Sequence, residues 1–198
     1  MFRVTQFLQE LRQPTPIMPR RNPPGPVVIW NLVRRCNLTC KHCYSISADK
    51  DFPGELTTAE VFRVMDDLKR ARVPVLILSG GEPLLRPDIY DIARHAKAMK
   101  FYTALSSNGT LITPENIERI AEVDFDYVGI SLDGIGATHD RFRCMEGAFK
   151  QSLAGIRLCR NARLKVGVRY TMTQENAQDL PALLQLVEDE GIDRFYFS

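Results

Sequence analysis

Three cysteines lie within eight residues of the sequence, in the stretch CNLTCKHC that runs from Cys36 to Cys43. Their spacing, C-x3-C-x2-C, lacks the second pair that usually completes a structural zinc site. His42 stands between Cys40 and Cys43 and could in principle ligate, but it would crowd the same turn. Three thiolates suit a four-iron, four-sulfur cluster, because they leave one iron open for a small-molecule ligand. The pattern therefore favours Cys36, Cys40 and Cys43 as ligands of such a cluster over a zinc site.

The composition is that of an ordinary globular protein, and 198 residues are enough for one domain with a sizeable core. Five cysteines are an odd number, and in a reducing compartment clustered thiols indicate metal binding rather than disulfides. The sequence shows no N-terminal apolar signal segment and no apolar run of membrane-spanning length. We therefore expect a cytoplasmic protein without a membrane partner.

Positive charge is concentrated around the cysteines, although the net charge of the chain is only +2. No Asp or Glu occurs between Glu10 and Asp49, and this segment carries six basic residues: Arg12, Arg20, Arg21, Arg34, Arg35 and Lys41. Such a segment suits a polyanion or a negatively charged cluster, and it can also be a plain solvated basic face. Its aromatic residues are sparse, so we expect no nucleic-acid partner.

A proline- and arginine-rich arm precedes a regular alternation of strands and helices. Residues 1–26 are predicted to be an extended basic arm, and residues 27–198 to be one core domain. The predicted strands are 27–33, 73–79, 101–107, 125–132, 164–173 and 193–198, and the predicted helices are 57–71, 86–100, 113–123, 147–162 and 179–191. This alternation implies right-handed βαβ units and a parallel sheet, hence an α/β fold. Six strands in simple succession suit a partial (β/α)6 barrel, which we expect to be truncated near strand six.

Polar motifs follow four of the predicted strands, where barrels of this kind carry their chemistry. The cysteines follow the first strand, and GGEP (Gly80–Pro83) follows the second. SSNG (Ser106–Gly109) follows the third strand, and SLDG (Ser131–Gly134) follows the fourth. Because the carboxyl ends of parallel strands share one rim, we expect these motifs to assemble a single site.

CNLTCKHC with a following SGGEP resembles the radical S-adenosylmethionine (SAM) family. The resemblance implies that Cys36, Cys40 and Cys43 bind a [4Fe–4S] cluster, whose open iron is chelated by the amino and carboxylate groups of SAM. It further implies that one-electron reduction cleaves SAM to methionine and a 5′-deoxyadenosyl radical, which abstracts hydrogen from the substrate. A low-potential electron donor of the flavodoxin or ferredoxin type is implied as a partner.

The resemblance also implies a set of cofactor-binding residues around SAM: His42, Gly80, Gly81, Glu82, Ser107, Asn108, Ser131 and Arg143. The two glycines would let the backbone approach the methionine moiety, and Glu82 would meet its ammonium group. Ser131 and Arg143 match a serine–arginine pair that contacts the ribose or carboxylate of SAM, and arginine suits a carboxylate through its two-pronged donors. Ser107 and Asn108 would lie beside SAM, and His42 close to its adenine.

Simpler interpretations stay open for these residues. GGEP alone is also typical of a strand-to-helix turn, and Ser107 with Asn108 is also an ordinary turn signal. Arg143 could be a surface helix residue, and His42 a solvated loop histidine. Cys159 lies in an apolar helical stretch and is predicted to belong to the core. Cys144 is either idle or a ligand of an auxiliary cluster or substrate metal, and no catalytic acid or base is assigned.

Within the family, PPGPVVIWNLVRRCNLTCKHCYS, SSNGTLI and GVRYTMT resemble the tetrapyrrole-modifying, SPASM-like branch, above all that of heme d1 biosynthesis. This resemblance implies removal of two propionate side chains from 12,18-didecarboxysiroheme, and the basic arm with Arg12, Arg20 and Arg21 is expected to engage acidic groups of that substrate. Alternatives are the siroheme-derived decarboxylase of the alternative heme pathway, a peptide-modifying or sulfatase-maturing enzyme, and a truncated cluster-binding module without turnover. Relatives continue into a cysteine-rich C-terminal region, so an auxiliary Fe–S cluster is expected beyond Ser198.

Overall fold

The computed structural model of the protein describes residues 2–12 and 25–197. Six parallel strands run in chain order from β2 to β7, and a short strand, β1, adds to β7 in the antiparallel sense. The strands are β1 (Phe2–Arg3), β2 (Val27–Val33), β3 (Val75–Gly80), β4 (Tyr102–Ser107), β5 (Tyr127–Ser131), β6 (Val166–Tyr170) and β7 (Arg194–Phe197). The six parallel strands confirm the predicted partial (β/α)6 barrel.

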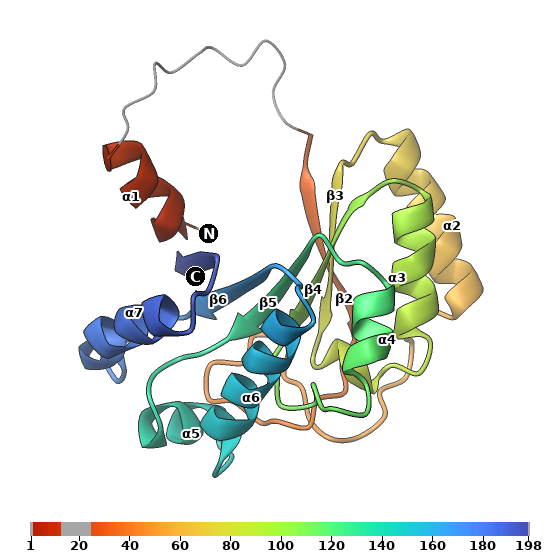
Figure 1. Cartoon of the computed structure of the whole chain (residues 1–198). Helices are drawn as coiled ribbons and strands as arrows, with labels where there is room; N and C mark the ends of the chain where they lie inside the picture. The colour runs from red at the N-terminus through yellow and green to blue at the C-terminus, as the bar shows by residue number, and fades with distance from the viewer. Residues whose placement is uncertain (1, 13–24, 198) are drawn as a thin grey trace.

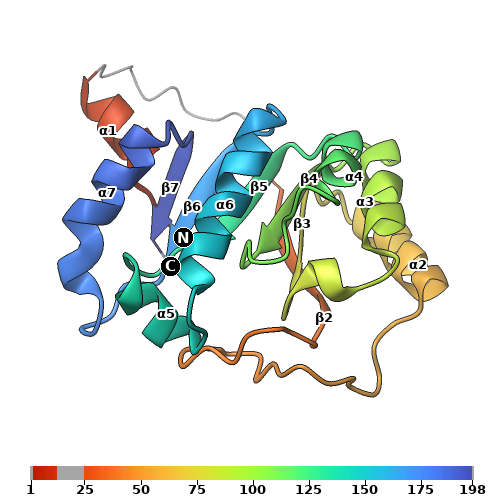
Figure 2. The same ribbon diagram turned by 60° about the horizontal axis from the view of Figure 1, so that its bottom comes forward.

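Helices cover the outer face of the curved sheet, as Figures 1 and 2 show. The helices of the described residues are α1 (Val4–Arg12), α2 (Thr58–Arg70), α3 (Ile89–Ala98), α4 (Ile117–Glu122), α5 (Ala137–Arg143), α6 (Ala148–Asn161) and α7 (Leu180–Asp189), with 3₁₀ turns at Pro83–Leu85 and Ala177–Asp179. Of these, α5 lies at the carboxyl ends of the strands (Figure 2). Thr57 and Glu60 form a reciprocal capping box at the start of α2. The predicted helix ranges do not include α5, and this helix carries Arg143.

The side chains of the strands alternate between an apolar outer face and a smaller, more polar inner face. Leu76, Leu105, Ile130, Val168 and Phe195 point outward beneath the helices, and each is fully buried. Since successive residues of a strand point to opposite faces, the residues between them point into the barrel. The outer face therefore supplies the core, and the inner face is left free to form a site.

Two inner-face glycines make room for a tyrosine near the amino ends of the barrel strands. Gly129 of β5 and Gly167 of β6 are directly paired in the sheet. A Cβ on Gly167 would lie 2.4 Å from the hydroxyl oxygen of Tyr127, and one on Gly129 would lie 2.9 Å from its ring. The Tyr127 ring thus fills the interior beside the two glycines and closes the barrel toward the amino ends of the strands.

The N-terminal segment differs from the prediction. The sequence predicted an extended arm over residues 1–26, but residues 2–12 form β1 and α1. β1 pairs with the edge strand β7, and Val4 packs against the core, so edge pairing and apolar burial order this segment. Residues 13–24, with Arg20 and Arg21, lie outside the described residues, and so does the side chain of Arg12. The predicted contact between this arm and a substrate therefore stays a prediction.

Among the described residues, no helix combines the length and the apolar character needed to cross a membrane.

Replacement of Leu105 tests the packing of the sheet against the helices. Leu105 lies on β4, an interior strand of the sheet, and is 0 % exposed. Leu105→Ala should lower the free energy of unfolding by about 2–5 kcal/mol, since it removes buried methyl groups and leaves a cavity. The matched variant Leu184→Ala, at a position of α7 that is 37 % exposed, should cost less than about 1 kcal/mol. Urea unfolding of both variants measures the difference, and equal losses would contradict this description of the core.

Candidate functional site

A cavity of about 400 Å³ opens at the carboxyl ends of the parallel strands. Its walls contain almost all of the residues that the sequence singled out: Cys36, Cys40, His42, Cys43, Gly80, Gly81, Ser107, Asn108, Ser131 and Arg143. Glu82 is the exception, because it is fully buried and does not line the cavity. The structure therefore brings the four polar motifs together at one rim, as the strand order predicted.

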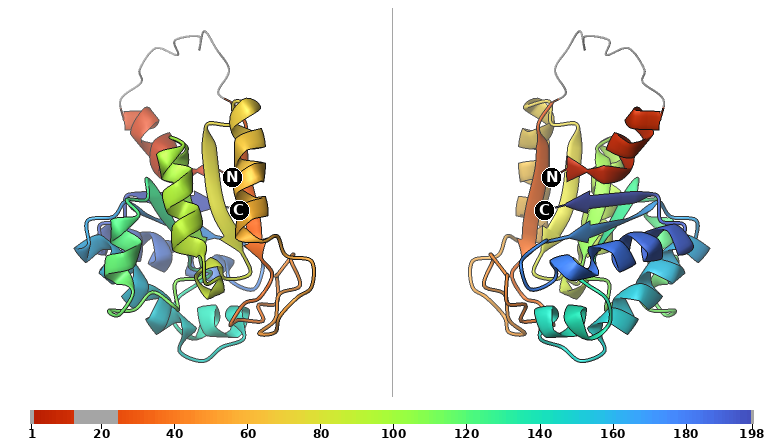
Figure 3. Two further views of the ribbon diagram at one scale, coloured as in Figure 1. Left: turned by 90° about the vertical axis from the view of Figure 1, so that its right-hand side faces the viewer. Right: turned by 90° about the vertical axis from the view of Figure 1, so that its left-hand side faces the viewer.

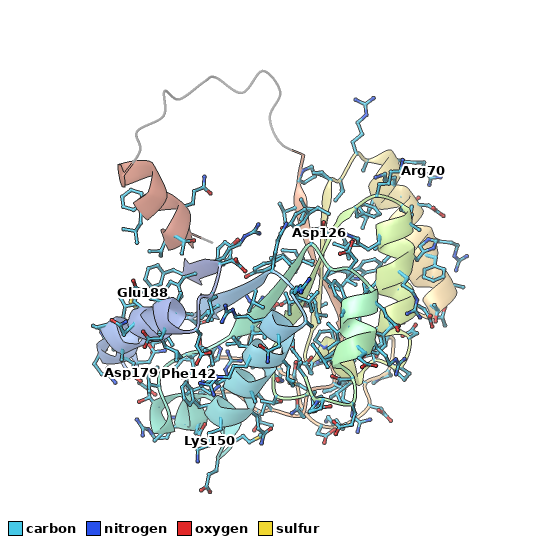
Figure 4. All side chains as sticks on the ribbon, in the orientation of Figure 1. Arg70, Asp126, Phe142, Lys150, Asp179 and Glu188 are labelled. Carbon is cyan, nitrogen blue, oxygen red and sulfur yellow. The ribbon has the colours of Figure 1, made fainter. Side chains whose placement is uncertain are left out.

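The cysteines lie on the long loop between β2 and α2, which folds over this end of the sheet (Figure 3). The Cys36 amide donates to the carbonyl of Ala48 (3.1 Å), and the Lys41 amide donates to the carbonyl of Phe142 in α5 (3.1 Å). Figure 4 shows Phe142 at the lower end of the molecule, opposite Asp126, which precedes β5 at the upper end. The loop is thus held both by its own backbone and by α5.

All three cysteines are free thiols; Cys36 is buried, whereas Cys40 and Cys43 are half-buried. Among the described residues, no three Cys, His, Asp or Glu side chains gather closely enough to hold a single metal ion. In a cuboidal cluster each thiolate binds a different iron, so its ligands stand further apart than those of one ion. The spread of the three thiols around one cavity fits the larger group.

The three thiols differ in acidity because their surroundings differ. Burial raises the pKa of Cys36 to about 11. Burial also raises the pKa of Cys40, although the nearby Arg143 guanidinium opposes the change. Burial acts on Cys43 in the same direction, but hydrogen bonds from Ser45 and Ser47 outweigh it and lower the pKa of Cys43 to about 7. Cys43 is therefore the thiol of the three that ionises most readily.

Gly80 and Gly81 are required by the cysteine loop itself. A Cβ on Gly80 would lie 2.3 Å from the carbonyl oxygen of Val33, and one on Gly81 would lie 2.4 Å from that of Arg35. Backbone atoms cannot move aside as the end of a side chain can, so these positions exclude any larger residue. The sequence explained the glycines by the approach of a cofactor; the structure adds close contact between two backbone segments as a reason for both.

Glu82 lies outside the cavity lining and binds residues at the end of β4. Its carboxylate accepts hydrogen bonds from the Ser107 hydroxyl (2.9 and 3.0 Å), the Asn108 amide (2.8 Å) and the Leu84 amide (3.1 Å). Burial raises the pKa of Glu82, while these hydrogen bonds oppose the shift. Ser107 and Asn108 line the cavity, and the Asn108 side-chain amide lies 3.8 Å from the Cys36 sulfur. Glu82 therefore acts on the cavity indirectly, because it holds the lining residues Ser107 and Asn108 in place.

Asp133, which the sequence analysis noted only as part of SLDG, is the centre of a second buried network. It is fully buried and forms an ion pair with Arg143. Its other oxygen accepts from the Thr171 amide (2.8 Å), and its own amide donates to Nδ1 of His139 (3.0 Å). Arg143 is not a surface helix residue: it is 7 % exposed, and its NH1 lies 3.7 Å from the Cys40 sulfur. Burial lowers the pKa of Arg143, but Asp133 and Cys40 outweigh it and raise the pKa above its ordinary value.

His42 lies beside this network rather than in solvent. Its ring stacks on Phe142 with 4.4 Å between the ring centroids, and its Nε2 is 3.6 Å from Asp133 Oδ2. Burial lowers the pKa of His42, although Asp133 opposes the shift. The neutral ring therefore presents a flat aromatic surface at the wall of the cavity.

Arg169 of β6 also lines the cavity, and sequence reasoning missed it. Its guanidinium donates to the hydroxyls of Ser106 and Ser131, the latter over 3.2 Å. The residue stands in the middle of a strand, where a charged side chain among apolar neighbours was the available signal. The remaining cysteines lie apart from the cavity: Cys159 is fully buried in the core, as predicted, and Cys144 is exposed at the end of α5.

The sequence matches the family model described as "Radical SAM superfamily" over residues 30–187. It is 55% identical to the Pre-heme d1 synthase of Dinoroseobacter shibae over 198 residues, which are 100% of this chain and 49% of that protein. It is 45% identical over 172 residues to the Fe-coproporphyrin III synthase of Methanosarcina barkeri, covering 87% of this chain and 43% of that protein. The chain thus spans about half the length of the curated relatives it matches.

The fold is similar to that of SuiB from Streptococcus suis, whose crystal structure contains bound S-adenosylmethionine. The TM-score is 0.75, with 19% sequence identity, over 88% of this chain and 40% of SuiB. At this identity the likeness concerns the fold alone, and it agrees with the partial barrel described above.

Alkylation of the chain without bound metal tests the order of thiol acidity. Cys43 should react with iodoacetamide first, with a midpoint near pH 7, because the thiolate is the reactive form and the pKa of Cys43 is about 7. Cys36 should react slowly below pH 9, because its pKa is about 11. Mass spectrometry of peptides after short exposure gives the rate at each cysteine. A faster reaction at Cys36 than at Cys43 at pH 7 would contradict the assigned surroundings.

The stability of the chain should depend on pH through His139. This residue is fully buried, and burial lowers its pKa to about 4, below the ordinary value of 6.5. As the pH falls from about 6.5 to about 4, the unfolded chain binds a proton that the folded chain does not, so the free energy of unfolding decreases. In His139→Asn, the side-chain carbonyl can still accept from Asp133, but this proton uptake is removed. Urea unfolding at pH 8, 6 and 4.5 should show a smaller loss in the variant; an unchanged pH dependence would exclude His139 as its source.

Proposed function

The chain belongs to the radical SAM superfamily, and on this premise we propose that it binds a [4Fe–4S] cluster and SAM in the rim cavity and modifies a tetrapyrrole. The observation that carries the proposal is the meeting of three free thiols with GGEP, SSNG and SLDG residues around one cavity. When bound, the cluster supplies an electron to SAM, whose reductive cleavage starts radical chemistry on the substrate.

The donor set fits the cluster. Cys36, Cys40 and Cys43 would be its ligands, and two polar side chains already point at their sulfurs. Arg143 lies 3.7 Å from the Cys40 sulfur, and the Asn108 amide lies 3.8 Å from that of Cys36. Hydrogen bonds and positive charge favour the thiolate, which is the form that binds iron. Arg143 and Asn108 would therefore stabilise the ligand sulfurs as well as close the cavity.

The remaining predicted residues have proposed roles toward SAM. Ser131 and Arg143 share the cavity wall and are proposed contacts for the ribose or carboxylate of SAM. Ser107 and Asn108 are proposed to lie beside SAM, held in place by Glu82. A direct contact between Glu82 and the SAM ammonium stays a prediction, and it would require the carboxylate to give up some of its present hydrogen bonds. His42 is a proposed neighbour of the adenine ring.

The proposed substrate is a tetrapyrrole with carboxylate side chains, most specifically 12,18-didecarboxysiroheme, from which two propionate side chains would be removed. Support comes from the 55% identity to a protein named Pre-heme d1 synthase and from the 45% identity to one named Fe-coproporphyrin III synthase. We further propose a low-potential electron donor of the flavodoxin or ferredoxin type as a partner, and a cytoplasmic location.

Anaerobic reconstitution tests the cluster. The wild-type chain should take up about four irons with the absorbance of an iron–sulfur cluster, and Cys40→Ala should abolish this uptake because one of three ligands is lost. Cys144→Ala is the matched control, since Cys144 is exposed and does not line the cavity; its iron content should match the wild type. One tightly bound zinc per chain without iron–sulfur absorbance would overturn the assignment.

Titration with 12,18-didecarboxysiroheme tests the substrate. The cluster-loaded chain should bind this tetrapyrrole, and SAM cleavage should accelerate in its presence once a reductant is supplied. Binding of a peptide substrate together with no binding of the tetrapyrrole would replace the proposed function by peptide modification. A loaded cluster with neither SAM cleavage nor substrate binding would reduce the chain to a cluster-binding module.

A further inference from the structure

Arg169 differs from the other arginines that pack inside the described part of the chain. The buried guanidinium of Arg86 pairs with Asp88 at 2.7 Å, and that of Arg143 pairs with Asp133. Arg169 forms no ion pair with any carboxylate of the described residues. Its guanidinium, on a half-buried side chain, therefore has no ion-pair partner within 4 Å in that part of the chain, and the buried carboxylates of Asp133 and Glu82 act on it only from further away.

The guanidinium of Arg169 is held in a defined position by neutral groups. It lies on the inner face of β6, where Arg169 pairs in register with Ser131 of β5. Its terminal nitrogens donate to the Ser106 hydroxyl, to the Ser131 hydroxyl (3.2 Å) and to the Gly129 carbonyl (3.4 Å). Its Nε is buried and has no hydrogen-bond partner. Arg169, Ser106 and Ser131 all line the cavity that contains the three cysteines.

A charge in this position is costly for the protein alone. Removal of a guanidinium from water is unfavourable unless a counter-charge or a full set of hydrogen bonds replaces the water. Burial lowers the pKa of Arg169 from its ordinary value, and the more distant Asp133 carboxylate offsets this shift only in part. Groups that lower stability in this way are typical of functional sites, where a ligand supplies the missing interaction.

The residues beside Arg169 on the inner face of the sheet have small side chains. A Cβ on Gly129 would lie 3.3 Å from the Nε of Arg169, so even alanine there would crowd the guanidinium. The strand neighbours on the cavity side are serines, and the Ser106 hydroxyl can also hydrogen-bond the Ser79 hydroxyl at 3.1 Å. These hydroxyls can therefore reorient toward a ligand and still keep a partner.

We propose that Arg169, together with the hydroxyls of Ser106 and Ser131, forms a carboxylate-binding subsite in the wall of the cavity. A planar guanidinium matches a carboxylate through two parallel hydrogen bonds, and serine hydroxyls can donate to the same oxygens. The inference rests on the proposed function, whose two small molecules both carry carboxylates: the methionine part of SAM and the side chains of the tetrapyrrole. Arg143, which the sequence suggested for the SAM carboxylate, already has Asp133 as its partner.

Paired ligands with and without a carboxylate test the subsite. Wild type, Arg169→Gln and Arg169→Lys, each loaded with the cluster, are titrated with SAM and with decarboxylated SAM. The same proteins are titrated with iron coproporphyrin III and with its tetramethyl ester. Arg169→Gln should weaken binding of one carboxylate-bearing ligand at least tenfold and change the affinity for its partner without carboxylate less than twofold. Arg169→Lys should recover part of the loss, because it restores the charge but not the planar fork.

The ligand that loses affinity identifies the source of the carboxylate, SAM or the tetrapyrrole. Arg157→Gln is the matched control, since Arg157 lies on the exposed side of α6 and pairs with Glu190; it should bind all four ligands as the wild type does. Unchanged affinities in Arg169→Gln, or equal losses for the ligands with and without carboxylate, overturn the subsite. Wild-type protein that binds neither SAM nor the porphyrin refutes the proposed function itself, and the subsite with it.

Unfolding of the metal-free chain separates a ligand-binding role from a structural one. If Arg169 serves a ligand, Arg169→Gln should unfold at the same urea concentration as the wild type or at a higher one, because a charge without a direct ion-pair partner is removed. If Arg169 mainly supports the barrel, the variant should unfold at a lower concentration, and loss of ligand binding would then reflect a damaged fold. That second result overturns the proposal.

Discussion

The site depends on the direct contact between two pieces of backbone at the end of β3. The Gly81 amide donates to the carbonyl of Val33 (2.6 Å), and the Glu82 amide donates to that of Arg35 (2.9 Å). These bonds hold the start of the cysteine loop against GGEP, and they are possible only because Gly80 and Gly81 have no side chains. Cys36 follows directly, and a second backbone bond ties it to Ala48. The position of the first thiol is thus set by main-chain geometry rather than by its own side chain.

Two buried carboxylates, those of Glu82 and Asp133, hold further segments in place at the rim of the barrel. Glu82 accepts hydrogen bonds from residues at the end of β4. One of these residues, Asn108, donates from its side-chain amide to Asn37 (3.0 Å) and lies 3.8 Å from the Cys36 sulfur. Asp133, just after β5, pairs with Arg143 of α5 and accepts a hydrogen bond from the Thr171 amide, directly after β6. The Arg143 guanidinium in turn lies 3.7 Å from the Cys40 sulfur. Each carboxylate is fully buried and surrounded by donors, so each joins loops that are distant in the sequence. These donors restrain the rotation of both carboxylates and so fix the segments that they join.

The sequence was sufficient to predict the parallel barrel and the cavity-lining motifs, because both follow local rules. Strand-sized apolar runs give the outer face, and polar residues just after each run must meet at one rim. It was not sufficient for Asp133 or Arg169, since their roles depend on partners 10 to 63 residues away in the chain. It also gave no range for α5 and missed the pairing of β1 with β7. α5 is short and follows a glycine rather than a capping side chain, and the pairing of β1 depends on an edge strand formed nearly 200 residues later.

The difference in acidity between the thiols has a consequence for how metal would enter the site. Metal ligation requires the thiolate, so a protonated thiol must lose its proton as the metal binds. At neutral pH Cys43, with its pKa near 7, is already partly ionised, and it lies at the half-buried edge of the cavity. Cys36 is buried and has a pKa of about 11, so its thiolate is disfavoured at neutral pH unless a positive charge lies close. The proposed cluster would provide such a charge, and at Cys40 the Arg143 guanidinium already opposes the effect of burial. Of these two thiols, Cys36 is therefore the one whose ionisation would depend more on the bound group.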